Sequence, residues 1–179
     1  DDALHANTDV TISGGTLTLA TGDDGVHADN DLVIGAKGSS STTTPKISIT
    51  ASYEGLEGTT VTVYSGDIDV AASDDGVNAA NSTLGERSDK YAINIAGGDL
   101  YIDAGSDGLD SNNDITITGG TVTAAGGFGN AGIGGGENGN GEDITINGGK
   151  VNASGAYGGA GIGGGVNGIG SKVTVSGAA

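Results

Sequence analysis

The chain has 179 residues, enough for one domain, and 23 acidic against 6 basic residues give a formal net charge of −17. This charge disfavours nucleic acid and anionic membranes as partners and favours cations. The absence of cysteine excludes disulfides and thiolate metal sites, glycine does not recur at every third position as in collagen, and no apolar run approaches the ~20 residues of a membrane span.

A six-residue motif, typified by Asp23-Asp24-Gly25-Val26-His27-Ala28, recurs along the chain in seven strong or weak copies. Each copy has one large apolar residue at its centre, and its first half is acidic in the earlier copies. In the two last copies, at 130–135 and 159–164, glycine and alanine replace the acids. The central apolar residues are Leu4, Val26, Leu56, Val77, Leu109, Ile133 and Ile162.

Two further short segments follow each motif except the last, which is followed by one, and in all of them apolar and polar residues alternate. In the first repeat they cover 9–13 and 16–19, and a Gly-Gly pair separates them. Alternation over so few residues indicates strands. A glycine pair between strands is also typical of a hairpin, but hairpins would not explain three distinct segments that recur every ~20–30 residues.

The repeats therefore predict an all-β fold, a right-handed, single-stranded parallel β-helix with about seven coils of three short strands. We expect one domain over 1–179, with acidic coils over 1–129 and glycine-rich coils over 130–179. Extra length falls in three loops, at 36–45, 81–90 and 136–142, and solenoid loops are common sites of function. The expected coils are 1–22, 23–53, 54–73, 74–106, 107–129, 130–158 and 159–179.

Acidic residues occupy the two positions before the motif glycine, so stacking the coils places five carboxylates about one strand spacing apart at one corner. Such carboxylates must be protonated, bind backbone amides or share cations. Calcium suits a set of oxygen ligands, whereas zinc is disfavoured because the chain has only two histidines. Alternatively, these aspartates only form turns. The predicted metal ligands are Asp1, Asp2, Asp23, Asp24, Glu54, Asp74, Asp75 and Asp107.

A polar column is expected beside this corner, because the residue after each central apolar residue points away from the core. We interpret the column either as the floor of a ligand site or as an ordinary solvated face. Arg87, the chain's single arginine, lies with Lys90 in the 81–90 loop beside the acidic corner. The candidate carbohydrate contacts are His5, His27, Glu57, Asn78, Arg87 and Asp110.

The motif Asp-Asp-Gly-Val-His/Asn-Ala, the Ile/Val-Thr-Ile-x-Gly-Gly-Thr-Leu/Val-Thr pattern after it, and the segment 52–58 resemble a bacterial cell-surface family of carbohydrate-binding β-helix proteins. The resemblance covers roughly residues 1–125. It implies a fold similar to pectate lyases, structural calcium at the acids named above, and binding of cellulose or acidic, pectin-like sugars. Tyr53 and Ser106 depart from the acidic pattern.

On this basis we expect a secreted or cell-surface bacterial module, non-catalytic, that binds calcium and plant cell-wall polysaccharide. One alternative is a calcium-dependent lyase of the pectate-lyase kind, which needs a base such as Arg87 or Lys90 near the metal. Another is a structural or adhesive stalk segment. Neither end carries an evident cap, so we also expect the native protein to extend further or to make end-to-end or homo-oligomeric contacts.

Overall fold

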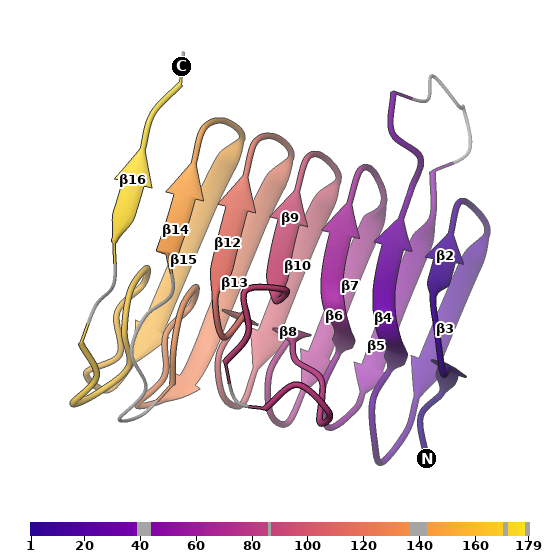
Figure 1. The fold of residues 1–179 in the computed structure, drawn as a ribbon, viewed down its shortest axis with the longest axis horizontal. Helices are drawn as coiled ribbons and strands as arrows, with labels where there is room; N and C mark the ends of the chain where they lie inside the picture. The colour runs from indigo at the N-terminus through magenta and orange to yellow at the C-terminus, as the bar shows by residue number, and fades with distance from the viewer. Residues whose placement is uncertain (39–43, 86, 137–142, 170–171, 178–179) are drawn as a thin grey trace.

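The computed structural model describes residues 1–38, 44–85, 87–136, 143–169 and 172–177. All three expected loops therefore lie partly outside the described residues, at 39–43, 86 and 137–142. Sixteen strands form two sheets, and every strand pair in them is parallel (Figure 1). None of the described residues belongs to a helix with the length and apolar character needed to cross a bilayer.

The strands stack as the coils of a parallel β-helix, which confirms the predicted fold. In Figure 1 the chain rises along the near sheet, crosses the top, descends along the far sheet and advances from right to left. This sense of rotation is right-handed, as is usual for parallel crossovers. The division of the chain into one domain with acidic and glycine-rich parts remains a prediction.

Coils 1 to 6 contribute strands to both sheets, and the described part of coil 7 contributes β16 to one of them. The ten-stranded sheet contains the first and second strands of the coils, and the six-stranded sheet contains the third strands. The ten are β1 (Leu4–Ala6), β2 (Val10–Ile12), β4 (Val26–Ile34), β6 (Leu56–Val63), β8 (Val77–Ala79), β9 (Ala92–Ile95), β11 (Leu109–Asp110), β12 (Asp114–Ile117), β14 (Asp143–Ile146) and β16 (Val173–Val175). The six are β3 (Thr16–Ala20), β5 (Lys46–Ala51), β7 (Asp67–Ala72), β10 (Asp99–Ala104), β13 (Thr121–Phe128) and β15 (Lys150–Ala156).

The first strand of the coil varies more than the repeat predicts. In coils 2 and 3 it runs on into the second strand, so that β4 and β6 are continuous across a register shift between Ala28 and Asp31. In coils 6 and 7 it is reduced to single bridges, from Leu109 to Ile133 and from Ile133 to Ile162. Glycine surrounds both isoleucines, and its weak strand propensity accounts for the shortened pairing.

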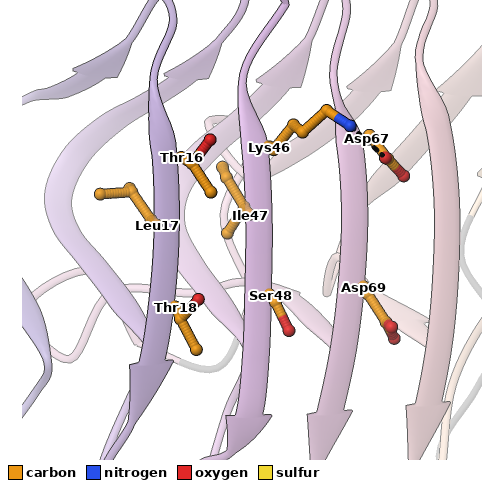
Figure 2. A pocket seen from close by; sticks show the side chains of 8 residues that line it. All are labelled: Thr16, Leu17, Thr18, Lys46, Ile47, Ser48, Asp67 and Asp69. Carbon is orange, nitrogen blue, oxygen red and sulfur yellow. Dashed lines mark ion pairs between the residues drawn. The ribbon is translucent and has the colours of Figure 1, made fainter.

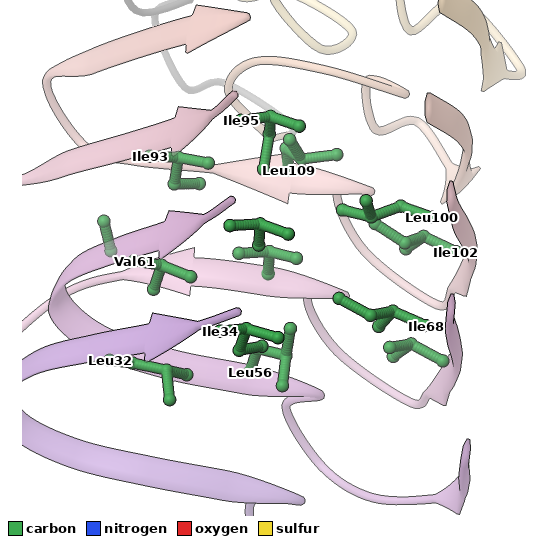
Figure 3. Close-up of a cluster of buried hydrophobic side chains, with 14 of the residues drawn as sticks. Leu32, Ile34, Leu56, Val61, Ile68, Ile93, Ile95, Leu100, Ile102 and Leu109 are labelled. Carbon is green, nitrogen blue, oxygen red and sulfur yellow. The ribbon is translucent and has the colours of Figure 1, made fainter. Parts of the chain in front are cut away.

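The core is a set of apolar columns along the axis of the coil. Equivalent residues of successive coils pair directly, as Leu32, Val61 and Ile93 do, and all three are fully buried (Figure 3). Val173 and Val175 of the last described strand are 43% and 71% exposed, because no described coil covers them. The stacking implied by the repeats is therefore confirmed in the interior coils. From the alternation in 173–175 we also expect Val173 and Val175 to be buried, and this expectation is wrong.

Glycine has two separate structural roles in the coil. At the corner between second and third strands the second glycine of the pair has positive φ, as at Gly98 (94°) and Gly120 (81°), which confirms the expected need for glycine there. The motif glycines that directly precede the central apolar residue, such as Gly25 and Gly76, do not have positive φ. Instead, a Cβ on Gly76 would lie 2.1 Å from Ile102 Cγ2 and 2.8 Å from the Gly108 carbonyl oxygen. The motif glycine is thus required by close contact between coils.

Candidate metal and glycan site

The acidic column forms a ladder of hydrogen bonds between coils. Asp2 Oδ1 accepts the Asp24 N–H at 3.2 Å, and Asp24 Oδ1 accepts the Glu54 N–H at 3.3 Å. Asp75 Oδ1 accepts the Asp107 N–H at 2.8 Å. One carboxylate oxygen of each of these aspartates therefore holds the backbone of the next coil, and the second oxygen is available for other partners.

The ladder ends where the acids end. Asp107 Oδ1 accepts the Ala131 N–H at 2.6 Å, and Ala131 has no carboxylate to pass the pattern on to coil 7. The interpretation of the aspartates as backbone partners is thus correct in part, although the amide they bind belongs to the neighbouring coil rather than to their own turn. This role uses one oxygen of each carboxylate and leaves metal binding open.

The outward polar column lies directly beside the ladder, as predicted. His5 pairs in register with His27, His27 with Glu57, and Glu57 with Asn78. His5 Nδ1 lies 2.5 Å from Asp2 Oδ2, and His27 Nδ1 lies 3.1 Å from Asp24 Oδ2. The two columns therefore form one polar face along β1, β4, β6, β8 and β11. We call this surface the acidic face.

Four groups on the acidic face bring three potential ligand atoms within 4.8 Å of one another. They contain five of the eight predicted metal ligands, together with His5, His27, Glu57 and Asp110 of the predicted glycan contacts. The predicted ligands Asp1, Glu54 and Asp74 belong to none of these groups among the described residues. The groups are Asp2/His5/His27, Asp24/His27/Glu57, Asp2/Asp23/Asp24 and Asp75/Asp107/Asp110.

Burial raises the pKa of several carboxyls on this face. Desolvation and the hydrogen bond with Glu54 raise the pKa of Glu57 to about 10, and desolvation also raises that of Glu54. Desolvation and the charge of Asp110 raise the pKa of Asp75 to about 8. At neutral pH and without a cation, Glu57 and Asp75 therefore retain their protons. A divalent cation is the natural replacement for these protons.

Asp74 has a different partner at the edge of the face. Its hydrogen bond and its negative charge raise the pKa of the exposed Tyr53 to about 12. Tyr53 stands where the repeat has an acid in other coils. A phenol and a carboxylate thus stand at equivalent positions of neighbouring coils, where other coils have two acids.

Asn78 offers an oxygen ligand that the sequence did not single out for metal. Its Nδ2 donates to Glu54 Oε2 at 2.8 Å, whereas its buried Oδ1 has no hydrogen-bond partner among the described residues. Asn78 pairs in register with Glu57 on one side and Asp110 on the other. An orphan amide oxygen flanked by carboxylates is a set of hard oxygen donors, and such donors fit calcium.

The loop that follows β8 covers the middle of the acidic face. Tyr91, which is 1% exposed, donates its hydroxyl to the carbonyl oxygens of Asn81 and Gly85 at 2.8 and 2.6 Å. Asn81 Nδ2 in turn donates to the Asp29 carbonyl and to Thr59 Oγ1. The loop is therefore tied to coils 2 and 3 as well as to its own coil. We call residues 80–91 the strap.

Two hollows open between the strap and the acidic face. The larger has a volume of about 400 Å³ and is lined by Glu54, Glu57, Asn78 and strap residues. The other, of about 250 Å³, is lined by His27, Asp29 and Glu57 on one side and by Ser82 and Thr83 of the strap on the other. Arg87 is exposed and lines neither hollow, so the structure does not bring it to the other predicted glycan contacts.

An aromatic pair lies elsewhere, and the sequence reasoning missed it. The rings of Phe128 and Tyr157 stack with their centroids 4.2 Å apart, and the residues are 66% and 75% exposed. Both residues stand five positions before the central isoleucine of their motif, Ile133 or Ile162. This shared repeat position was the available signal. Such an exposed pair is a surface on which a sugar ring can stack, and it is separate from the acidic face.

The outer face of the six-stranded sheet is also polar. Figure 2 shows Thr16, Thr18, Ser48 and Asp69 on successive strands around a shallow hollow of about 250 Å³. Lys46 Nζ lies 3.7 Å from Asp67 Oδ2 across two neighbouring strands. Most side chains here are short and exposed, whereas Asp24, Asp75 and Asp107 of the acidic face are buried.

Comparison with known protein families gives two matches. A family described as carbohydrate-binding domain-containing protein matches residues 26–176, and one described as beta helix repeat matches residues 10–28. The first covers most of the chain, so the chain belongs to this carbohydrate-binding domain family. The predicted family resemblance is thus confirmed. No curated protein and no solved structure matches the chain significantly.

Proposed function

We propose that the protein is a secreted or cell-surface, non-catalytic module that binds plant cell-wall polysaccharide through its acidic face, with calcium held by the carboxylate groups. The family supports carbohydrate binding in general. The observation that carries the finer proposal is the set of close carboxylates beside two solvent-open hollows. Calcium would neutralise these carboxylates and present a positive centre to the glycan.

Among glycans we favour an acidic, pectin-like chain such as polygalacturonate, with cellulose as the second candidate. The hollows under the strap are lined mainly by carboxylates, amides and hydroxyls. Sugar recognition on this face must therefore be polar. A chain with a formal net charge of −17 repels a polyanion unless cations intervene, so calcium bridging explains how the two would associate.

Retention on polysaccharide tests this function. The protein is mixed with insoluble polygalacturonate gel or cellulose, with calcium or with EDTA, and the bound fraction is measured. We expect retention with calcium, loss with EDTA, and at least about tenfold weaker retention for Glu57→Gln combined with Asn78→Ala, since one good polar contact contributes about 1–2 kcal/mol. Asp69→Asn, on the opposite sheet, is the matched control and should retain binding.

Two other outcomes have clear meanings. Retention that survives Glu57→Gln with Asn78→Ala and is lost in Phe128→Ala would move the glycan site to the aromatic pair. No retention on any plant polysaccharide would contradict the proposed function and leave the structural or adhesive stalk as the better explanation.

Lyase activity remains the second candidate because calcium beside a basic residue is the arrangement that β-elimination requires. Arg87 and Lys90 are both exposed on the strap, next to the hollows but outside their linings. Absorbance of unsaturated products from polygalacturonate with calcium measures the activity directly. A rise that Arg87→Ala abolishes would overturn the non-catalytic assignment.

A further inference from the structure

Both histidines of the chain lie together at one end of the acidic face. His5 on β1 and His27 on β4 are register partners in adjacent coils, and their rings lie 4.9 Å apart between centroids. One ring nitrogen of each histidine and one Asp2 carboxylate oxygen lie within 4.8 Å of one another, and the two Nδ1 atoms lie 2.5 and 3.7 Å from Asp2 Oδ2. The chain has only two histidines, which disfavours zinc from the sequence, but both of them lie beside the same carboxylate oxygen of Asp2.

We propose that Asp2, His5 and His27, with Asp24 as fourth ligand, form a binding site for a borderline divalent transition-metal ion, with zinc as the reference ion. Two imidazole nitrogens and two carboxylate oxygens form a tetrahedral donor set that zinc accepts and that calcium, which prefers oxygen ligands, does not. The site is distinct in chemistry from the carboxylate-only group of Asp75, Asp107 and Asp110.

The carboxylates are already oriented toward this site. Asp2 and Asp24 each use Oδ1 to accept the backbone N–H of the next coil, which fixes the side chain. Their Oδ2 atoms then lie 3.7 and 3.1 Å from His27 Nδ1. Neither carboxylate has to leave its backbone partner in order to bind the ion, so little ordering remains to be done on binding.

The far nitrogens of both histidines also have partners. His27 Nε2 lies 3.5 Å from Asp29 Oδ1, and His5 Nε2 lies 3.3 Å from the Asn7 side-chain amide. The Asp29 carboxylate favours the His27 tautomer with its proton on Nε2, which leaves the Nδ1 lone pair for metal. At His5 the Asn7 Nδ2 group donates to Nε2, so the proton lies on Nδ1 beside Asp2. Metal binding displaces this proton, and a flip of the Asn7 amide then lets its oxygen accept from His5 Nε2. Metal-binding histidines usually have such a hydrogen bond on their second nitrogen.

The spacing needs only a small adjustment. Ligand atoms on a tetrahedral zinc ion lie about 3.3 Å apart, given zinc–ligand distances of about 2.0 Å. His27 Nδ1 is already 3.1 and 3.7 Å from its two carboxylate neighbours. His5 Nδ1 and Asp2 Oδ2, now 2.5 Å apart, must separate by somewhat less than 1 Å. The His5 side chain is 39% exposed, which leaves it room to move.

The test is a titration of tag-free, metal-depleted protein with zinc by calorimetry and with cobalt by visible absorption, both in excess calcium. We expect saturable zinc binding and the strong visible bands of four-coordinate cobalt. His27→Gln should abolish the bands and weaken zinc binding by more than about 100-fold. Asp29→Asn should weaken it by about tenfold, because it loses only the group that orients His27. Asp75→Asn, in the carboxylate-only group, is the matched control and should bind zinc normally.

Unchanged zinc affinity in His5→Gln combined with His27→Gln would overturn the site. Equal loss in Asp75→Asn would also overturn it, because zinc would then only replace calcium in the carboxylate groups. His5→Gln alone serves if the His27 variant does not fold, since His5 is the more exposed of the two. A native far-UV circular dichroism spectrum shows that a variant is folded. The zinc readout does not depend on glycan binding, so failure of one proposal leaves the other standing.

Discussion

The motif glycine shows how a single residue sets the spacing between coils. At Gly25, Gly55, Gly76 and Gly108 an added Cβ would lie 2.2 to 2.8 Å from a backbone carbonyl oxygen of the next coil. The obstructing atoms include backbone carbonyl oxygens, which belong to the paired coil and cannot move without breaking its hydrogen bonds. Alanine at these positions must therefore push two coils apart.

We predict that Gly76→Ala lowers the free energy of unfolding by about 1–3 kcal/mol, the range typical of overpacked interiors. Gly22→Ala is the matched control, because a Cβ at Gly22 meets nothing within 4 Å and its φ is not positive. Urea unfolding followed by far-UV circular dichroism measures both. Equal stability of the two variants would show that the coils tolerate the extra methyl and that the motif glycine serves some other purpose.

The residues of the acidic face were predictable from the sequence, but their partners were only partly so. The repeat period placed His5 beside His27 and Asp2 beside Asp24, because these pairs stand at equal positions in neighbouring coils. The use of one oxygen for the next coil's amide depends on backbone geometry that a repeat does not specify. Asn78, expected to face outward, is 7% exposed because the strap returns over it from outside the repeat.

At the scale of elements, the strap shows how an insertion between two strands is held against the coils. It depends on Tyr91, whose ring is buried and whose hydroxyl binds two strap carbonyls. The Asn81 N–H also donates to this hydroxyl at 3.2 Å. One side chain from the start of the second strand thus fixes the course of the loop before it.

We predict that Tyr91→Phe loosens the strap without unfolding the coils. Removing the hydroxyl leaves the strap carbonyls without their donor, which costs about 1–3 kcal/mol locally. Hydrogen exchange of the Asn81 and Leu84 amides should accelerate by at least about tenfold, while exchange in β10 stays unchanged. Tyr101→Phe, on an exposed residue of β10, is the control. Acceleration throughout the protein would instead mean that Tyr91 stabilises the whole core.

The strand pattern was the most predictable feature, since each apolar column has one residue per coil and the register follows from the repeat alone. The exceptions are physical rather than accidental. In β4 the residues between the first two segments, Asp29 and Asn30, are themselves extended, and the two segments merge into one strand; β6 is continuous in the same way. The first strand of coils 6 and 7 shrinks to a bridge because glycine gives it no side chains to pack.

At the scale of the whole molecule, the acidic face makes stability depend on pH and on cations together. Without a cation, Asp75 and Glu57 hold protons in the folded state up to a pKa of about 8 and about 10, whereas in the unfolded chain their pKa values are 3.8 and 4.5. A carboxyl whose pKa is higher in the folded state than in the unfolded chain makes its full contribution to stability at pH values below its unfolded pKa. That stabilisation is lost as the pH rises toward the folded pKa.

We therefore predict that in EDTA the free energy of unfolding falls as the pH rises from about 5 to 8, by at most about 1.4 kcal/mol per pH unit for each such group. Calcium binds the ionised carboxylates in place of these protons, so the stabilisation it gives should be smallest at pH 5 and largest at pH 8. Thermal melts across this range, with calcium and with EDTA, measure both slopes.

Asp75→Asn separates the proton from the metal in this linkage. The amide oxygen can still accept the Asp107 N–H, but the side chain neither ionises nor binds calcium as strongly. In EDTA the variant should lose part of the fall in stability between pH 5 and 8, and at pH 8 it should equal or exceed the native chain. With calcium at pH 8 the order should reverse. A calcium effect that is the same at every pH, or an Asp75→Asn profile parallel to the native one, would show that Asp75 is not part of the cation site.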